Sequence, residues 1–355
     1  MTTLENVLAR YTRVGDLWEK IDERRVRCHA CGHECPIFEG QAGVCKVRRN
    51  QEGRLMVPWG YVSGAQCDPI EKKPFYHVAP GSSAFSFGML GCDLHCSYCQ
   101  NWITSQALRD PDAVAGAFRA TPEGLVGQAL EDGAKFIVST YNEPLITVEW
   151  AVAVFQAARE VGMATGFVSN GNATKEVLKY LRPHLDLYKV DLKSFSGEQY
   201  RKLGGRLAPI LDSIQRIHDM GFWLEVVTLV VPGFNDSSSE LSQIAGFLNG
   251  VSPDIPWHVT AFHGDYRMTQ PGDTPVQTLE RAVDIGRAAG LHYVYAGNAP
   301  GMVGECENTR CPNCGKRLVR RRGYHILQNL ITDEGRCPGC QASIAGRWKA
   351  PRVRA

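Results

Sequence analysis

A repeated unit of helix, glycine and strand dominates the middle of this 355-residue chain. From about residue 120, each amphipathic helical segment ends at a glycine, and a short apolar strand follows it. A glycine just past a helix adopts the left-handed conformation that ends the helix. The glycines in this position are Gly133, Gly162, Gly221 and Gly290. The pattern predicts strands over residues 84–90, 136–140, 164–168, 187–192, 223–231, 257–262 and 293–295.

Strands that alternate with helices form parallel βαβ units. Six or seven such units suit a complete or partial (β/α) barrel. A flat, doubly wound sheet is the alternative, but no glycine-rich phosphate loop follows the first strand to favour it. The sequence therefore predicts an α/β fold with a partial or complete (β/α) barrel over residues 83–301. Small cysteine-rich, metal-binding modules are predicted over residues 1–82 and 302–355.

The chain has thirteen cysteines, and eleven of them fall into three groups along the sequence. The groups are Cys28, Cys31, Cys35 and Cys45; Cys92, Cys96 and Cys99; and Cys311, Cys314, Cys337 and Cys340. Cys67 and Cys306 stand outside them, and neither receives a predicted role. Clustered C-x2-C pairs without a secretion signal indicate metal ligands in a reducing compartment rather than disulfides.

Composition narrows the class of protein further. The 39 Lys and Arg nearly balance the 37 Asp and Glu, so the chain lacks a global basic field for nucleic acid. No apolar run reaches about 18 residues, so no membrane span is expected. The first residues lack the charged-then-apolar layout of a secretion signal. We therefore expect a cytoplasmic metalloprotein.

The central group, Cys92-x3-Cys96-x2-Cys99, supplies three thiolates with no fourth cysteine nearby. A closed structural zinc site uses four protein ligands. A cubane iron–sulfur cluster has four irons, so three thiolates leave one iron free to bind another molecule. The spacing favours the cluster over two alternatives: a zinc site completed by a distant ligand, and core cysteines without a metal. Tyr98 places an aromatic ring directly before the third cysteine.

Polar residues follow most of the predicted strands at the point where each strand ends. In a (β/α) barrel these positions gather at the carboxyl-terminal mouth, where active sites lie. Any one of them could instead cap a helix or form a turn, which is the expected role of Asp236. The others include the 92–99 cysteine loop and Asn142, Glu143, Ser169, Asn170, Asp191, Lys193, His263, Asp265 and Asn298.

Taken together, these motifs resemble those of radical S-adenosylmethionine (radical SAM) enzymes of the pyruvate formate-lyase-activase-like group. Within that group the chain is most similar to the AmmeMemoRadiSam system radical SAM enzyme. The resemblance covers nearly the whole chain. The segments that carry it are 28–35, Asp-Pro-Ile-Glu-Lys-Lys-Pro at 68–74, 92–102, Thr-Tyr-Asn-Glu-Pro at 140–144, 190–193, 231–236 and 307–309.

The resemblance implies a [4Fe–4S] cluster on Cys92, Cys96 and Cys99, with SAM bound to the open iron. A flavodoxin or ferredoxin would supply one electron, and cleavage of a C–S bond would yield methionine and a 5′-deoxyadenosyl radical. The radical would remove hydrogen from an unidentified substrate, in an oxidoreductase-like or transferase-type reaction. Memo-type and Ammecr-type proteins are the partners that it suggests.

The resemblance also implies where SAM would be held. Asn142, Glu143 and Pro144 occupy the place of the family's Gly-Gly-Glu motif, with Tyr141 and Asn142 in place of the glycines. Glu143 would accept from the SAM ammonium, or it is an acid in the first turn of the next helix. The predicted SAM contacts are Tyr98, Asn142, Glu143, Ser169, Asn170, Asp191 and Lys193.

Two further residues keep alternative roles. Lys193 would neutralise the SAM carboxylate, or it pairs with Asp191. His263 is a candidate substrate contact or a structural histidine.

The two outer cysteine groups differ in regularity. Cys311, Cys314, Cys337 and Cys340 form two C-x2-C knuckles of zinc-ribbon or rubredoxin-like layout, which predicts a structural zinc over an electron-transfer iron. Eleven Lys and Arg face three acids over residues 307–355. That excess could dock an acidic redox protein or nucleic acid, or form a solvated face.

The first group is less regular, and His29 and His33 lie within it. Zinc and a second iron–sulfur cluster are both compatible with Cys28, Cys31, Cys35 and Cys45, and zinc is our prediction.

Three functions compete at this point. The first is a radical SAM enzyme acting on an unidentified substrate. The second is a glycyl radical enzyme activase of the pyruvate formate-lyase-activating type, whose substrate is a backbone glycine of a partner. The third is a non-catalytic, zinc-dependent binding protein that uses its basic tail.

Overall fold

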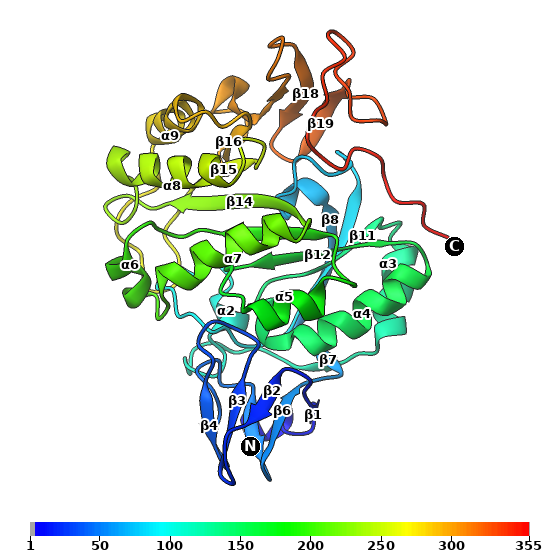
Figure 1. Ribbon diagram of the computed structural model, residues 1–355, viewed down its shortest axis with the longest axis vertical. Coiled ribbons are helices and arrows are strands. Elements are labelled where there is room, and N and C mark those ends of the chain that lie inside the picture. Colours follow the sequence, from blue (N-terminus) through cyan, green and yellow to red (C-terminus); the bar gives the residue numbers. More distant parts are fainter. Residues whose placement is uncertain (1–3, 355) are drawn as a thin grey trace.

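The computed structural model describes residues 4–354, and one eight-stranded sheet forms its centre (Figure 1). Its strands run in the order β16-β15-β14-β13-β12-β11-β9-β8. Seven are parallel: β9 (Ser83–Gly88), β11 (Phe136–Ser139), β12 (Ala164–Ser169), β13 (Leu187–Asp191), β14 (Trp223–Val230), β15 (Trp257–Ala261) and β16 (Val294–Gly297). The eighth, β8 (Gly64–Pro69), pairs antiparallel with β9.

The parallel strands stand side by side in the order in which the chain makes them. A doubly wound sheet would instead reverse its order at a switch point. Within residues 4–354 no pairing joins β8 to β16, so the sheet stays open. The prediction of an α/β fold with a partial (β/α) barrel is confirmed, and the predicted strands are present.

Helices separate the strands and cover the sheet; in Figure 1, α5, α7 and α8 lie over its near face. Thr121 caps α3 as the sequence predicts, since its Oγ1 accepts a hydrogen bond from the Gly124 amide at 3.1 Å. The helices are α2 (Trp102–Ser105), α3 (Pro122–Glu131), α4 (Val148–Glu160), α5 (Lys175–Leu181), α6 (Gly197–Lys202), α7 (Leu207–Asp219), α8 (Ser238–Val251) and α9 (Val276–Ala288). No helix of residues 4–354 has the length and apolar character needed to cross a membrane.

The N-terminal region lies at one end of the long axis (Figure 1). After α1 (Leu4–Leu8) it forms two small antiparallel sheets, β1-β6-β5 and β2-β3-β4, and β7 pairs with β10. The strands are β1 (Thr12–Val14), β2 (Trp18–Lys20), β3 (Arg25–Cys28), β4 (Pro36–Phe38), β5 (Arg49–Gln51), β6 (Arg54–Pro58), β7 (Tyr61–Val62) and β10 (Phe118–Arg119). A short 3-10 turn, η1 (Ile70–Lys72), follows β8.

The C-terminal region packs at the other end of the molecule (Figure 1). The 3-10 turn η3 (Gly304–Glu307) leads into it from β16. Another 3-10 turn, η2 (Pro144–Thr147), lies within the barrel between β11 and α4. The C-terminal sheet holds β17 (Thr309–Arg310), β18 (Arg317–Arg322) and β19 (His325–Asn329).

A buried polar network ties this region to the barrel. The Glu225 carboxylate, at the start of β14, accepts hydrogen bonds from the backbone amides of Tyr76 and His77 at 3.0 and 2.9 Å. The His77 ring contacts the Ala345 carbonyl at 2.6 Å and the Tyr295 hydroxyl at 2.5 Å. One buried cluster thus joins the segment before β9, two barrel strands and the C-terminal region.

Candidate active site at the carboxyl ends of the strands

A cavity of about 400 Å³ opens at the carboxyl ends of the parallel strands. That volume lies within the usual range of small-molecule sites. The three cysteines of the 92–99 loop line it, and so do all seven residues predicted to contact SAM. Those residues are Cys92, Cys96, Cys99, Tyr98, Asn142, Glu143, Ser169, Asn170, Asp191 and Lys193. The fold therefore brings together side chains that the sequence spreads over a hundred positions.

The loop that carries the three cysteines follows β9 and begins at Gly91, whose φ is +94°. Cys96 is buried and the other two are half-buried. Burial raises the pKa of all three thiols, and that of Cys96 to about 12. Neutral thiols bind metal poorly, so a bound cation is what would hold these sulfurs as thiolates.

The arrangement of the three sulfurs differs from that of ligands around a single ion. A single ion gathers its thiolates onto one small tetrahedron, whereas each thiolate of a cubane binds a different iron. Within residues 4–354, Cys92, Cys96 and Cys99 do not form a group whose sulfurs all lie within 4.8 Å of one another. These three sulfurs are therefore not gathered around one point as the ligands of a single ion are.

Glu143 lies inside the cavity wall, held by three donors. Its carboxylate accepts from the Ser169 hydroxyl at 2.7 Å, the Asn170 amide at 2.7 Å and the Leu145 amide at 3.1 Å. The bond from Leu145 makes Glu143 the N-cap of η2, so this residue does lie at the start of a helical turn. It also lines the cavity. Burial, and then the charge of Asp93, raise the pKa of Glu143 to about 8.

Asp93 is a site residue that the sequence analysis missed. Its side chain is fully buried and accepts from the side-chain amides of Asn170 and Asn172 at 2.7 and 2.8 Å. It thereby ties the cysteine loop to the end of β12. The available signal was an acid placed directly after the first cysteine of the motif.

Tyr141 adopts a φ of +70°, a conformation that favours glycine. The Asn142 side chain is engaged with backbone: its Oδ1 accepts from the Met89 amide at 3.0 Å and its Nδ2 donates to the Glu143 carbonyl at 3.2 Å.

Strand β13 contributes a row of charged side chains. Asp191 pairs with Lys189 and, at 3.5 Å, with Lys193, so the ion pair considered for Lys193 is present. Burial would lower the pKa of Lys193, but Asp191 and the nearby Cys96 outweigh it and raise that pKa. Lys189 was missed because it lies within the apolar strand pattern.

His263 lies outside the residues that line the cavity. Its exposed ring accepts a hydrogen bond at Nε2 from the side-chain amide of Gln100 at 2.8 Å, and Gln100 does line the cavity. Four further lining residues were not predicted as site residues, although the two lysines belong to the 68–74 segment: Lys72, Lys73, Thr260 and Tyr324. Asn298, expected at the mouth, lines it as well.

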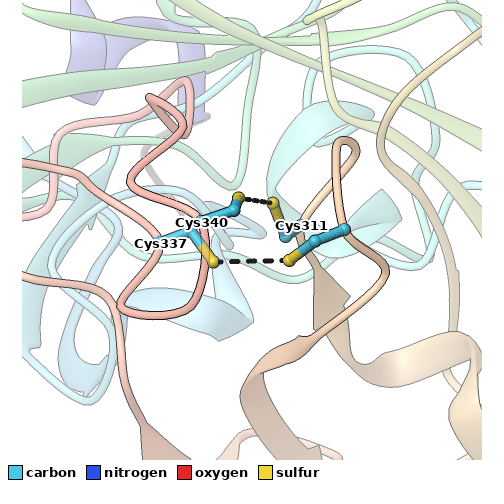
Figure 2. Close-up of side chains that lie close together, drawn as sticks. Cys311, Cys337 and Cys340 are labelled. Atoms are coloured by element: carbon cyan, nitrogen blue, oxygen red, sulfur yellow. Dashed lines mark hydrogen bonds between the residues drawn. The ribbon is translucent and has the colours of Figure 1, made fainter.

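The C-terminal cysteines form a second, separate site (Figure 2). Cys311 and Cys340 have their sulfurs 3.6 Å apart, those of Cys314 and Cys337 are 3.7 Å apart, and all four lie within 4.8 Å. Four sulfurs at about 2.3 Å from one metal ion would be about 3.8 Å from one another. The predicted four-cysteine group is therefore present, with the dimensions of a tetrahedral metal site.

The N-terminal cysteines differ from that set. Cys28, Cys31 and Cys45 are buried and Cys35 is half-buried. In the part of the chain that the structure describes, they do not make a group of ligand atoms within 4.8 Å.

Comparison with known proteins places this arrangement in a family. Residues 88–244 match the Radical SAM superfamily. The chain is 38% identical over 331 residues to an uncharacterized protein, MJ0808, of Methanocaldococcus jannaschii, covering 92% of this chain and 97% of that protein.

More distant similarities were also found. The pyruvate formate-lyase-activating enzyme of Staphylococcus aureus is 23% identical over 189 residues, which cover 49% of this chain and 72% of that enzyme. Among solved structures, a radical SAM methyltransferase from Sphaerobacter thermophilus aligns with a TM-score of 0.47 and 17% identity, over 63% of this chain and 68% of that one. With its cysteine loop at the mouth of an open parallel sheet, this chain belongs to the radical SAM superfamily, which implies an iron–sulfur cluster and SAM.

Proposed function

We propose that this protein is a radical SAM enzyme whose [4Fe–4S] cluster is held by Cys92, Cys96 and Cys99. In this proposal it cleaves SAM reductively and removes hydrogen from a substrate that is still to be identified. One observation carries the proposal: a single cavity is lined by the three cysteines and by every residue predicted to contact SAM.

When bound, the cluster and SAM supply the one-electron cleavage of a C–S bond, which yields methionine and a 5′-deoxyadenosyl radical. The chain supplies binding, orientation and exclusion of water. Glu143 offers a carboxylate that three donors hold in place, which suits the SAM ammonium. Lys193, near Cys96, adds a half-buried positive charge that would stabilise a thiolate and attract a carboxylate.

The partners follow from this chemistry. Because the cleavage consumes one electron at a time, we infer a flavodoxin or ferredoxin-type donor. The resemblance to the AmmeMemoRadiSam enzyme supports Memo-type and Ammecr-type proteins as further partners. The four C-terminal cysteines are proposed to hold a structural zinc.

The test is anaerobic reconstitution with iron and sulfide, followed by dithionite and SAM, with 5′-deoxyadenosine measured over time. Wild-type protein should form it, and Cys96→Ala should form none. Cys67→Ala, which changes a cysteine outside all three groups, is the matched control and should behave as wild type. Equal product from Cys96→Ala and wild type would show that the cluster is assigned to the wrong residues.

A glycyl radical enzyme activase is the second candidate, supported by the similarity to pyruvate formate-lyase-activating enzymes over about half of the chain. Its substrate would be a backbone glycine of a large partner protein. Incubation with that partner should then produce an electron-spin-resonance doublet on the partner. Transfer of deuterium from a labelled small molecule into 5′-deoxyadenosine would favour the first candidate instead.

A further inference from the structure

We propose that Cys28, Cys31, Cys35 and Cys45 hold a second iron–sulfur cluster, and that it passes electrons to the site at Cys92–Cys99. The first half of this proposal stands on the N-terminal region alone. The second half, the relay, rests on the function proposed above. This proposal differs from the sequence-based prediction, which was zinc at these four cysteines.

The spacing of the sulfurs separates the three cysteine groups into two kinds. The C-terminal four lie within 4.8 Å of one another, as ligands of a single ion do. Neither the N-terminal four nor the central trio forms such a group within residues 4–354. The irons of one cluster do not need their thiolates gathered as closely as a single ion does, and four thiolates are the number that closes a cubane.

The N-terminal four are nevertheless neighbours. The Cys28 amide donates to the Cys35 carbonyl at 3.1 Å. A Cβ on Gly43 would lie 3.4 Å from the Cys35 sulfur, so the loop that leads to Cys45 packs against Cys35. Cys31 is within electrostatic reach of both Cys28 and Cys45. The four cysteines are therefore neighbours within the N-terminal region, and three of them are buried.

A buried ion pair holds the loop of Cys45 in position. Arg48 donates two hydrogen bonds to the Glu149 carboxylate of α4, at 2.7 and 2.6 Å, and both side chains are buried. The Gly43 amide donates to the Arg48 carbonyl at 2.9 Å, which closes the loop onto this anchor. A buried, rigid setting of this kind shields a cluster from water and oxygen.

The N-terminal group lies directly against the loop of the central trio. One nitrogen of Arg109 donates to the Val44 carbonyl at 2.6 Å and to the Cys92 carbonyl at 2.7 Å. The His33 ring lies 3.2 Å from the Asp93 carbonyl. A Cβ on Gly91 would lie 3.1 Å from the Cys45 carbonyl, so these backbones touch where only glycine fits.

This contact gives an electron a short path through protein. In the relay, a reduced flavodoxin or ferredoxin-type protein loses one electron and the N-terminal cluster gains it. The N-terminal cluster is then oxidised again as the same electron passes to the central site. No bond forms or breaks in the protein.

The first experiment removes the central site. The triple variant Cys92→Ala/Cys96→Ala/Cys99→Ala is reconstituted anaerobically, and its iron, sulfide and zinc are measured together with its Mössbauer spectrum. We expect about four irons and four sulfides to remain per chain, with a cluster signature. Loss of all iron, or zinc at both outer groups, would overturn the proposal. Because this variant cannot perform radical SAM chemistry, the result is independent of the proposed function.

The second experiment tests the relay in the wild-type protein. Reduced flavodoxin is mixed with reconstituted protein, and freeze-quench electron-spin-resonance spectra follow both clusters. The spectrum of the triple variant identifies the N-terminal signal, which should appear before the central one. If the central signal appeared first, the proposed electron relay would be refuted, whereas the assignment of two clusters would still hold.

A variant provides the matching functional readout. Cys31→Ser should lose at least tenfold in the rate at which reduced flavodoxin reduces the central cluster, but should keep central iron and the metal at Cys311–Cys340. An unchanged rate would contradict the relay. If the variant does not fold, the order of reduction in the wild type still decides the question.

Discussion

At the scale of single residues, the site depends on carboxylates that are buried before any ligand arrives. Glu143 and Asp93 are both buried, and they lie close enough for Asp93 to raise the pKa of Glu143. The three cysteines could be predicted because they lie close together in sequence, and Glu143 because it belongs to the Tyr-Asn-Glu-Pro segment. Asp93 could not be assigned in that way, since its partners Asn170 and Asn172 follow another strand. Lys189 pairs with Asp191 of its own strand, but the apolar pattern of that strand hides it.

Replacement of Glu143 by Gln should weaken SAM binding. The substitution removes the charge that would face the ammonium, and a hydrogen bond to a charged group contributes about 1.5–3 kcal/mol. We therefore expect the Kd for SAM to rise roughly 10- to 100-fold in reconstituted protein, as measured by equilibrium binding. Glu160→Gln, an exposed change on α4, is the control. An unchanged Kd in Glu143→Gln would remove this residue from the site.

His77 predicts how stability depends on pH. Burial lowers the pKa of His77 to about 4, because its ring lies among barrel and C-terminal residues. As pH falls below about 6.5, the unfolded chain takes up this proton while the folded chain does not. The free energy of unfolding should therefore fall by up to about 3 kcal/mol between pH 6.5 and 4, and this contribution is absent above pH 7.

Urea unfolding at a series of pH values would measure that slope. His77→Gln should flatten it, whereas His218→Gln, on the surface of α7, should leave it as in wild type. The same slope in His77→Gln and wild type would show that the acid sensitivity arises elsewhere.

At the scale of elements, the periodic sequence pattern predicted the strands of the large sheet, but it did not predict the contacts between loops. Strands β11, β12, β14 and β16 each follow a helix and a glycine in the sequence, so their conformation can be predicted from neighbouring residues. Gly91 is different. Its sequence context predicts only a turn, but its place is decided by Val47 and Cys45 from a distant loop.

Two glycine substitutions should therefore act in opposite directions. In Gly91→Ala the new Cβ would lie 2.9 Å from Val47 Cγ1 at a φ of +94°, and we expect a loss of roughly 2–5 kcal/mol of stability, with less iron bound. Gly127 lies within α3 with open space around it, so Gly127→Ala should stabilise the protein by about 1 kcal/mol. Denaturant unfolding and iron analysis measure both, and similar effects from the two changes would contradict this account.

At the scale of the whole molecule, the C-terminal region is part of the barrel's architecture. Arg321 of β18 donates to the Tyr76 carbonyl at 2.7 Å, and Tyr324, just past that strand, lines the cavity. Its four cysteines therefore hold together a region that also shapes the candidate active site.

Removal of one C-terminal sulfur should show this coupling. Cys314→Ser is expected to lose about one zinc per chain, together with stability, because a structural metal contributes its binding energy to folding. Elemental analysis and thermal unfolding are the measurements, and Cys306→Ser, outside the group, is the control. Iron in place of zinc at this site, or equal losses in the control, would refute the assignment.

The amino-acid order alone was enough for the parallel strands, the glycines that end the helices and the cysteine spacing, because each of these depends on residues within about ten positions. Folding decided the rest. The lining of the cavity, which includes Tyr324, and the contact between Val44 and Arg109 join residues from separate regions. Such contacts depend on how layers pack in space, and a linear pattern carries no record of that packing.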